Sequence, residues 1–379
     1  FNVARSLGPA LGGAMLAAAG AATVFVVNAF SFLGLINALV WRKIHNPAPA
    51  LPPEPMGEAI RAGLRYVAMS PTLPPIYLRS ALFAFGGSIV PALAPLVAHD
   101  FLNSGPIEYG LLLAGFGAGS LFGALMLAYF RVRYGVERLV TVANIAYTVA
   151  VFVLGLSRYL PLSICMMAIA GACWIFVLAS VSTSVQLCSP RWIVGRAIAF
   201  SQIASVGGIA IGAFVWGAVA KELGLQGAFL TAAGYLVAAS FIGRIAPLPQ
   251  REFNLSPNDD LTIPPPRLHI DNQTGPIIVT IEYEVPQKDA ASFLATMHQL
   301  GRIRKRDGAQ RWRIFQDIDR PEIWFEQIES ATWLDHLRRA SRFTIDDMAI
   351  RVEAEKYRTQ ESPALKRMAQ RPRGSEPLS

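Results

Sequence analysis

The residues with the most scope for chemistry are a few polar side chains set inside long apolar stretches. Arg5 is the clearest of them, since an ionised group in an apolar surrounding is costly unless it has a partner or a function. The other candidates are Ser88, Asn144, Trp174, Gln186 and Gln202. We predict that these six residues line an internal polar pathway. The alternative for the last five is that each satisfies a neighbouring helix, and the alternative for Arg5 is that it extends to lipid headgroups.

Residues of the types used in catalysis and metal binding form no recognisable pattern. Cys165, Cys173 and Cys188 lie in or beside one apolar stretch and lack the spacing of metal ligands. We therefore predict buried free thiols, with no catalytic residue, metal site or cofactor. The glycine-rich segments lie within apolar stretches, not between a strand and a helix, so a phosphate-binding loop is not expected.

Eight long apolar stretches must position the polar candidates. They are apolar on every face, unlike the one-sided helices of a soluble domain, and about 20 apolar helical residues cross a bilayer core about 30 Å thick. The composition agrees, with 53% hydrophobic and 16% charged residues. The sequence therefore predicts an all-α membrane region over residues 1–246. Its eight spans are expected near 3–19, 22–41, 76–98, 109–130, 139–157, 160–182, 197–220 and 225–246.

Basic residues fall on alternate sides of these spans. One side carries Arg42, Lys43, Arg61, Arg65, Arg131, Arg133, Arg138, Arg191, Arg196, Arg244 and Arg251. The positive-inside rule makes this side cytoplasmic, which predicts a multi-pass protein of the bacterial inner membrane with a cytoplasmic C-terminal region. Membrane topology thus explains the net charge of +8, and no nucleic acid partner is predicted.

The first residues and the one long connection suggest how the spans are grouped. Phe1 stands where an initiator Met is expected and leads directly into a span, so we expect a fragment whose N-terminal helices are missing. Residues 42–75 separate two spans from six. They hold several prolines and then an amphipathic stretch with Met56, Ile60 and Leu64, which suits the cytoplasmic membrane surface.

Two segments resemble a known family. The opening Arg5-Ser-Leu-Gly8-Pro9, followed by Asn28-Ala-Phe-Ser31-Phe32, resembles helices five and six of major facilitator superfamily exporters in the enterobactin-exporter-like, transmembrane secretion effector group. The segment Pro190-Arg-Trp-Ile-Val-Gly195-Arg196 resembles the connection between helices ten and eleven of that group. The resemblance implies a partial major facilitator fold, helices five to twelve of twelve. It also implies export of small hydrophobic or siderophore-like molecules by alternating access between two six-helix halves.

Small residues recur at helical spacing in three spans. The stripes are Gly8 and Gly12, then Gly115, Gly119 and Gly123, then Ser201, Ser205, Gly208 and Gly212. Such stripes let helix backbones approach closely in lipid. The resemblance places them on helices five, eight and eleven, which implies sliding at the interface between the halves. Static packing is the alternative.

The charged groups leave the coupling ion open. We predict that Arg5 contacts an anionic substrate or locks the two halves together. No Asp or Glu lies in the middle of a span, so a proton-coupling carboxylate would belong to the missing helices or to the edge with Asp100 and Glu108. The segment from Arg131 to Arg138 lacks the Asp of the superfamily's loop between helices eight and nine, which argues against a charge-relay gate there.

The composition changes after Ala246. Proline-rich residues 247–275 predict a stiff linker. Residues 277–285 alternate as a half-buried strand, residues 290–300 have helical spacing, and two further strands and a helix follow up to residue 340. This order predicts a ferredoxin-like α+β domain over residues 276–357. A disordered tail is expected over residues 358–379.

The stretch Glu329-Ser-Ala-Thr-Trp333-Leu-Asp-His336-Leu337 resembles the dimeric antibiotic-biosynthesis-monooxygenase-like domain. That resemblance implies a homodimer through this domain. Relatives of the fold include cofactor-free oxygenases, in which Trp324, Trp333, His298 and His336 would form a pocket. We predict core and structural roles for these residues, because no nucleophile and base pair is recognisable. A regulatory protein anchored by its helices and a membrane-tethered oxygenase are the alternatives to an exporter.

Overall fold

The computed structural model describes residues 2–41, 51–101, 106–249, 253–256, 263–359 and 364–371, with side chains described from Ala22 onward except at residues 101, 106 and 244. Contacts divide the chain into two units. The helical unit comprises Phe1–Pro47, Thr72–Gln186 and Ile198–Arg251. The mixed unit comprises Ala48–Pro71, Leu187–Ala197 and Glu252–Ser379. The mixed unit thus includes two segments that connect helices of the other unit.

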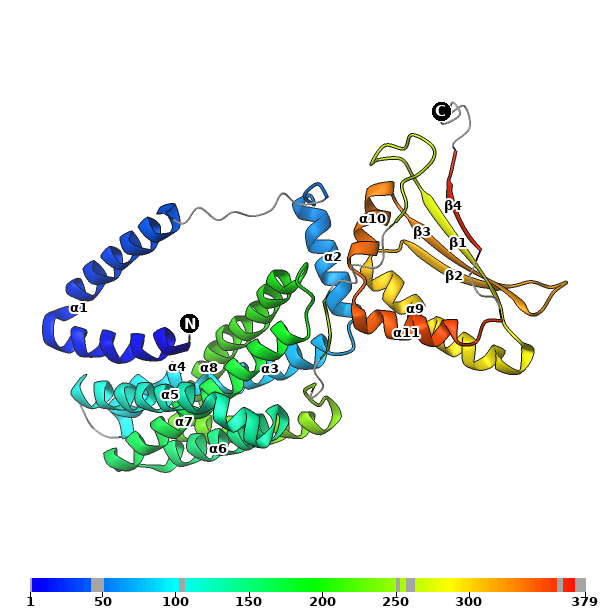
Figure 1. Cartoon of the computed structure of the whole chain (residues 1–379). Helices are drawn as coiled ribbons and strands as arrows, with labels where there is room; N and C mark the ends of the chain where they lie inside the picture. Colours follow the sequence, from blue (N-terminus) through cyan, green and yellow to red (C-terminus); the bar gives the residue numbers. More distant parts are fainter. Residues whose placement is uncertain are drawn as a thin grey trace. The chain divides into compact units, whose positions relative to one another are not determined.

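Long helices make up the helical unit (Figure 1). They are α1 (Asn2–Trp41), α3 (Leu73–Gly87), α4 (Ile89–Leu96), the π-helical turn η1 (Val97–Phe101), α5 (Pro106–Tyr134), α6 (Val136–Leu156), α7 (Leu160–Leu187) and α8 (Val194–Ile245). Within the described residues, six helical segments are long and apolar enough to cross a membrane, namely Ala22–Trp41, Leu73–Asp100, Ile107–Tyr134, Val136–Leu156, Leu160–Leu187 and Val194–Gly243. The mainly helical, membrane-spanning character of this region is confirmed.

Two predicted boundaries between spans have different outcomes. Helix α1 covers the first two predicted spans as one element from Asn2 to Trp41, so the boundary between these spans stays a prediction. The intervening alanine-rich residues favour helix, and the single Gly20 costs only about 1 kcal/mol. Figure 1 shows α1 bending. In α8 the prediction is right, because Gly224 leaves the helical conformation at φ 74° and ψ 167°. Its positive φ is easy for glycine and costly for other residues.

A four-stranded antiparallel sheet forms the centre of the mixed unit (Figure 1). Its strands are β1 (Ile277–Glu284), β2 (Arg311–Gln316), β3 (Ile323–Ser330) and β4 (Leu365–Ala369), in the order β2-β3-β1-β4. The helices are α2 (Met56–Met69), the short 3₁₀ turn η2 (Gln287–Asp289), α9 (Ala290–Asp307), α10 (Trp333–Ser341) and α11 (Ile345–Glu355). The coarse prediction of a small α+β region is confirmed, and the ferredoxin-like assignment remains a prediction.

One face of this sheet is covered and the other is open. Residues of β1 alternate strictly between buried and half-buried positions, as a strand with one covered face should. The buried side chains Val279, Ile281 and Tyr283 pack with Phe293 and Met297 of α9. The opposite face carries exposed residues of β2, including Phe315, which is 46% exposed.

The predicted end of the domain is wrong. Strand β4 lies inside residues 358–379, which we expected to be a disordered tail, and it pairs with β1 from Ile277 to Ile281. The segment is short and charged, so its composition does not predict a strand. The backbone groups on the free edge of β1 supply its partners. Helix α11 was also not predicted, although Thr344 and Asp347 form the capping box that begins it.

Candidate functional site

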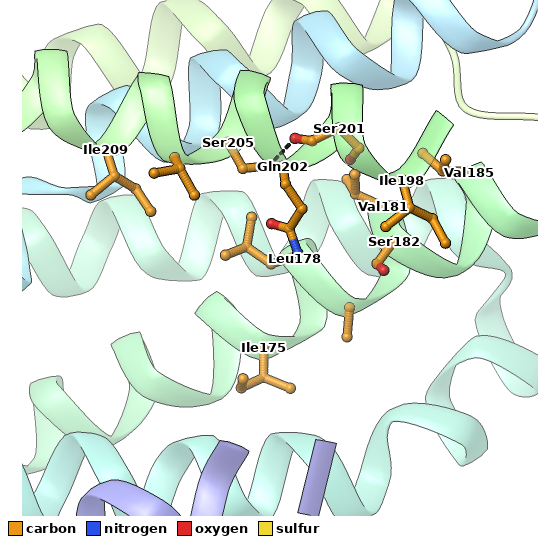
Figure 2. Close-up of a pocket in the computed structure, with 12 residues that line it drawn as sticks. Ile175, Leu178, Val181, Ser182, Val185, Ile198, Ser201, Gln202, Ser205 and Ile209 are labelled. Atoms are coloured by element: carbon orange, nitrogen blue, oxygen red, sulfur yellow. Dashed lines mark hydrogen bonds between the residues drawn. The ribbon is translucent and has the colours of Figure 1, made fainter. Parts of the chain in front are cut away.

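A narrow cleft lies between α7 and α8 in the helical unit. Its floor and walls are mostly aliphatic, and its polar residues are Ser182 of α7 with Ser201, Gln202 and Ser205 of α8. Figure 2 shows the Gln202 amide directed towards α7, near Leu178 and Ser182. The cavity volume is about 60 Å³, far below the roughly 300 Å³ of a typical ligand pocket. The cleft therefore offers one wall of a pathway, not a complete binding site.

The hydroxyl groups at the base of this cleft are already paired. Ser205 donates to the carbonyl of Ser201 at 2.9 Å, and its oxygen lies 2.6 Å from the hydroxyl of Ser80 on α3. Gln202 is exposed, whereas Ser201 and Ser205 are buried. Of the polar groups on this part of α8, Gln202 is consequently the one best placed to contact a molecule in the cleft.

Gln186 lies one turn beyond Ser182 on α7 and is exposed. Its Nε2 donates to the carbonyl of Ser182 at 3.2 Å. The structure therefore places Gln186 on the same helix as the cleft, with its amide bonded to its own helix.

Trp174 belongs to an aromatic cluster inside the bundle. Its ring centroid lies 5.7 Å from that of Phe83, 6.2 Å from Tyr147 and 6.5 Å from Phe116. The Tyr147 hydroxyl donates to the carbonyl of Gly87 at 2.6 Å. Trp174 is 8% exposed, so these contacts favour a packing role.

Ser88 is buried and Asn144 is half-buried. The Ser88 hydroxyl donates to the Phe85 carbonyl at 2.8 Å, at the junction of α3 and α4. Asn144 donates from Nδ2 to the Ser240 hydroxyl at 2.8 Å, and its Oδ1 has no partner among the described residues. A cavity of about 20 Å³ adjoins Asn144, which is large enough for one water molecule. Neither residue reaches the Gln202 cleft.

An ion pair that the residue pattern did not predict lies beside Asn144. Arg79 of α3 donates to Glu137 of α6 at 2.5 Å, and the side chains are 10% and 18% exposed. The same carboxylate accepts from the backbone N–H of Leu248 at 2.8 Å. Arg79 lies inside the predicted span 76–98, so a charge within an apolar stretch was the available signal. Glu137 thus supplies an acidic group on a segment where we expected no charge relay.

The glycine stripes bring helices together within the helical unit. On α5, a Cβ on Gly115 would lie 2.9 Å from the carbonyl oxygen of Ile164 on α7, and one on Gly123 would lie 2.8 Å from that of Ala172. Gly119, between them, is closer still to the backbone of Ala168. On α8, Gly208 and Gly212 approach the backbone of α3 in the same way. These contacts favour the static-packing alternative for both stripes.

The remaining predicted site residues lie outside what the structure describes. The side chain of Arg5 and the surroundings of Gly8 and Gly12 belong to residues whose side chains are not described. Their assignment to a substrate pathway and a helix interface remains a prediction.

The residues that an oxygenase would use form two separate pairs in the mixed unit. The His298 ring packs edge-on against the Trp312 ring, with their centroids 5.9 Å apart. The ring centroids of His336 and Trp333 lie 5.2 Å apart. Trp324 is buried in the hydrophobic core. The described residues therefore do not bring these side chains to one pocket.

Apolar helices, glycine-mediated helix packing and a polar cleft between two spans define a multi-pass membrane protein of the transporter class. The chain belongs to the transmembrane secretion effector family, whose model matches residues 1–373. It is a member of the major facilitator superfamily and is placed in the inner membrane.

Curated relatives agree with this class. The multidrug efflux pump Tap of Mycobacterium tuberculosis (strain H37Rv) is 27% identical over 274 residues, which is 70% of this chain and 63% of the relative. Tap of Mycolicibacterium fortuitum is 25% identical over 234 residues, 61% of this chain and 57% of the relative. The chain thus spans less than two thirds of the length of these relatives. The matched proteins are transporters and not enzymes, as predicted.

Proposed function

We propose that this protein exports small hydrophobic molecules across the inner membrane by alternating access, with the cleft between α7 and α8 as one wall of the substrate pathway. The family and the efflux pumps that the chain resembles support the class of activity. The observation that carries the site is the position of Gln202, whose amide points into an otherwise largely aliphatic cleft. A siderophore-like molecule is a narrower candidate, suggested by the resemblance noted in the sequence.

The chemistry of the cleft favours substrates with much apolar surface and few polar groups. Aliphatic side chains bind such molecules without directional demands, and a single amide can donate or accept one hydrogen bond. A binding site of this kind tolerates several substrates, because it rejects few of them by unpaired polar groups. This property fits efflux of multiple compounds, the activity in the relatives' names.

The family also favours transport over the anchor alternative. A helical anchor needs no glycine stripes that bring α5 onto α7 or α8 onto α3, whereas a transporter requires helices packed closely enough to move as a body. The cytoplasmic orientation of the C-terminal region and the homodimer belong to the same proposal and rest on the sequence patterns.

Efflux assays with defined probes test the proposal. Cells expressing the complete protein should accumulate less Nile red, a neutral hydrophobic probe, than cells with the empty vector. Gln202→Leu should change the order of preference among Nile red, ethidium and a catecholate siderophore at matched membrane levels. Gln186→Leu is the matched control, because that amide bonds its own helix. Equal accumulation of every probe with and without the protein would contradict export.

The role of Arg5 has its own test. An unpaired cation just inside the hydrocarbon costs about 2.5 to 3.5 kcal/mol on insertion scales, so a functional Arg5 should be needed for efflux, not for insertion. Arg5→Ala is expected to lower efflux while membrane levels stay unchanged. Unchanged efflux would leave contact with lipid headgroups as the better explanation.

A further inference from the structure

Two connections of the membrane helices fold with the C-terminal residues. Ala48–Pro71 follows α1, and Leu187–Ala197 joins α7 to α8, yet both segments belong to the mixed unit. Helix α2 in the first connection packs against α9. Its Tyr66 is only 2% exposed. We expected Met56, Ile60 and Leu64 of this helix to lie at the membrane surface, and these side chains are exposed. Ala59, Ala62 and Tyr66 of the same helix are buried against protein, and the membrane contact stays a prediction.

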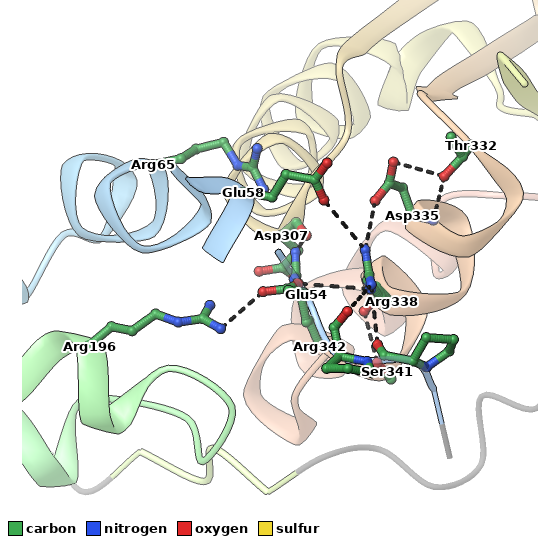
Figure 3. A network of polar contacts seen from close by, with 12 residues as sticks. Glu54, Glu58, Arg65, Arg196, Asp307, Thr332, Asp335, Arg338, Ser341 and Arg342 are labelled. Atoms are coloured by element: carbon green, nitrogen blue, oxygen red, sulfur yellow. Dashed lines mark hydrogen bonds and ion pairs between the residues drawn. The ribbon is translucent and has the colours of Figure 1, made fainter. Parts of the chain in front are cut away.

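Glu54 is the carboxylate that joins the three segments of the mixed unit. Its Oε2 accepts from Arg196 of the α7–α8 connection at 3.0 Å. Its Oε1 pairs with Arg342 and lies 4.0 Å from the Nε of Arg338. Figure 3 shows Glu54 between Arg196 on one side and Arg338 and Arg342 on the other. The Glu54 side chain is 14% exposed, so water screens these pairs weakly.

The arginines around Glu54 also bind backbone groups. Arg338 donates to the carbonyls of Pro52 and Pro53 at 3.2 and 3.3 Å. Arg342 donates to the carbonyl of Asp307 at 2.9 Å, and its guanidinium carbon lies 4.3 Å from the centre of the Trp192 ring. Both guanidinium groups are buried, and loss of the carboxylate would leave them without their shared counter-charge. Burial lowers the pKa of Arg342, and Glu54 opposes that effect.

A second set of contacts joins the same segments through Tyr66. The Tyr66 ring meets Trp192 edge-on at 5.4 Å, and the guanidinium of Arg306 lies 4.9 Å from the Tyr66 ring centre. Arg306 also donates to Asp347 of α11 at 2.7 Å. The basic run at the end of α9 therefore includes one arginine, Arg306, that contacts both Tyr66 and Asp347. The α2 segment and the α7–α8 connection are thus joined by two groups of side chains that meet at Trp192.

We propose that the C-terminal fold is a clamp which, through Glu54, fixes the connection before α3 to the connection between α7 and α8 and so restrains the transport cycle. Alternating access changes the distances between helix connections on one side of the membrane. A contact that bridges two such connections stabilises one conformation over the others by its own free energy. The restraint on transport rests on the proposed function, whereas the clamp itself rests on the contacts alone.

The chain contains a natural reporter of the clamp. Cys188 lies in the α7–α8 connection and is 5% exposed. In a background with Cys165→Ala and Cys173→Ala, Cys188 is the sole thiol, since the sequence has three cysteines. A membrane-impermeant maleimide applied to the detergent-solubilised full chain should label it slowly. Glu54→Gln should speed this labelling by about tenfold, because the buried thiol reacts only when the clamp opens.

The controls separate the clamp from general damage. Glu58→Gln is the matched variant, since this carboxylate lies 3.8 Å from Arg338 and is 62% exposed. It should label like the parent. Arg342→Gln should speed labelling as Glu54→Gln does, because it removes the other member of the pair. Both fast variants must elute as a single species in size-exclusion chromatography. Labelling at the parent rate in Glu54→Gln and Arg342→Gln would overturn the clamp.

Efflux of Nile red provides the second arm. Release of a restraint should raise the rate at saturating probe by about twofold in Glu54→Gln and leave it unchanged in Glu58→Gln. Faster labelling without faster efflux would refute the restraint on transport and keep the clamp. Failure of the parent protein itself to export any probe would refute the proposed function, and the labelling result would still stand.

Discussion

The helical unit and the mixed unit each depend on a different kind of internal contact. Helices α5 and α7 approach through glycines until backbone meets backbone, whereas α9 meets α11, and the Glu54 segment meets α10, through arginines paired with carboxylates of low exposure. The difference follows from the surrounding medium. Lipid gives no hydrophobic drive for helix association, so close van der Waals contact must replace it. In water an arginine stem covers apolar surface while its head pairs with several acceptors.

The strongest test of this contrast is Gly119→Leu in α5. The new side chain would meet the Ala168 backbone of α7, which cannot move aside as a flexible side chain can. We expect a loss of about 3 kcal/mol, at the upper end for overpacking, seen as a lower thermal midpoint in detergent. Gly110→Leu is the control on the same helix, because no atom lies within 4 Å of its Cβ position. A stable Gly119→Leu protein without transport would instead support the sliding interface.

The Arg79–Glu137 pair tests whether the helical unit also depends on charge. Arg79→Met should destabilise the protein by about 2 kcal/mol, less than the roughly 3 to 5 kcal/mol for one partner of a fully buried pair, because Glu137 is 18% exposed and bonds Leu248. The double variant Arg79→Met with Glu137→Gln should lose less free energy of unfolding than the sum of the losses in the two single variants. Additive losses would show that the two charges act separately.

The amino-acid pattern predicted the apolar membrane helices, because hydropathy alone decides them. It also predicted the break at Gly224, where turn chemistry and a boundary in hydropathy coincide. It failed for β4 and for Glu54, since both depend on partners far away in the chain. Strand β4 exists because β1 has a free edge, and Glu54 is one acidic residue in a proline-rich segment until three arginines from other segments surround it.

The mixed unit should also respond to pH, through His336. Burial, with Arg339 and Arg367 adding to it, lowers the pKa of His336 from 6.5 to about 3. Between these two values the unfolded chain binds a proton at His336 and the folded state does not. The free energy of unfolding therefore falls as pH is lowered from about 6.5 towards 3. His336→Gln should flatten this loss in thermal unfolding followed from pH 7 to 4.

Asp307 should change the stability of the folded state with pH in the direction opposite to His336. Burial raises its pKa to about 6, although the neighbouring Arg306 opposes the shift. The folded state then holds a proton more tightly than the unfolded chain, so this residue contributes stability at low pH that is lost as pH rises from about 4 to 6. Asp307→Asn should steepen the acid loss. The same slope in both variants would contradict these assignments.

The smallest expected effect concerns the open face of the sheet, where we expect a second copy of the chain to bind. Phe315 of β2 pairs with Phe325 of β3, which is opposite Glu282 of β1, while Arg313 lies on the same exposed face of β2. We expect a second copy related by a two-fold axis to cover these phenylalanines, because an isologous interface uses the same face of both copies. We expect the full chain in detergent to be a dimer by light scattering. Phe315→Glu should shift it towards monomer without lowering its thermal midpoint, whereas Ile318→Glu, a change at a 96% exposed residue in the β2–β3 connection, should leave the dimer intact. A monomer at every concentration would show that this sheet face stays solvated and would contradict the dimer. The clamp through Glu54 would be unaffected, because it lies within one chain.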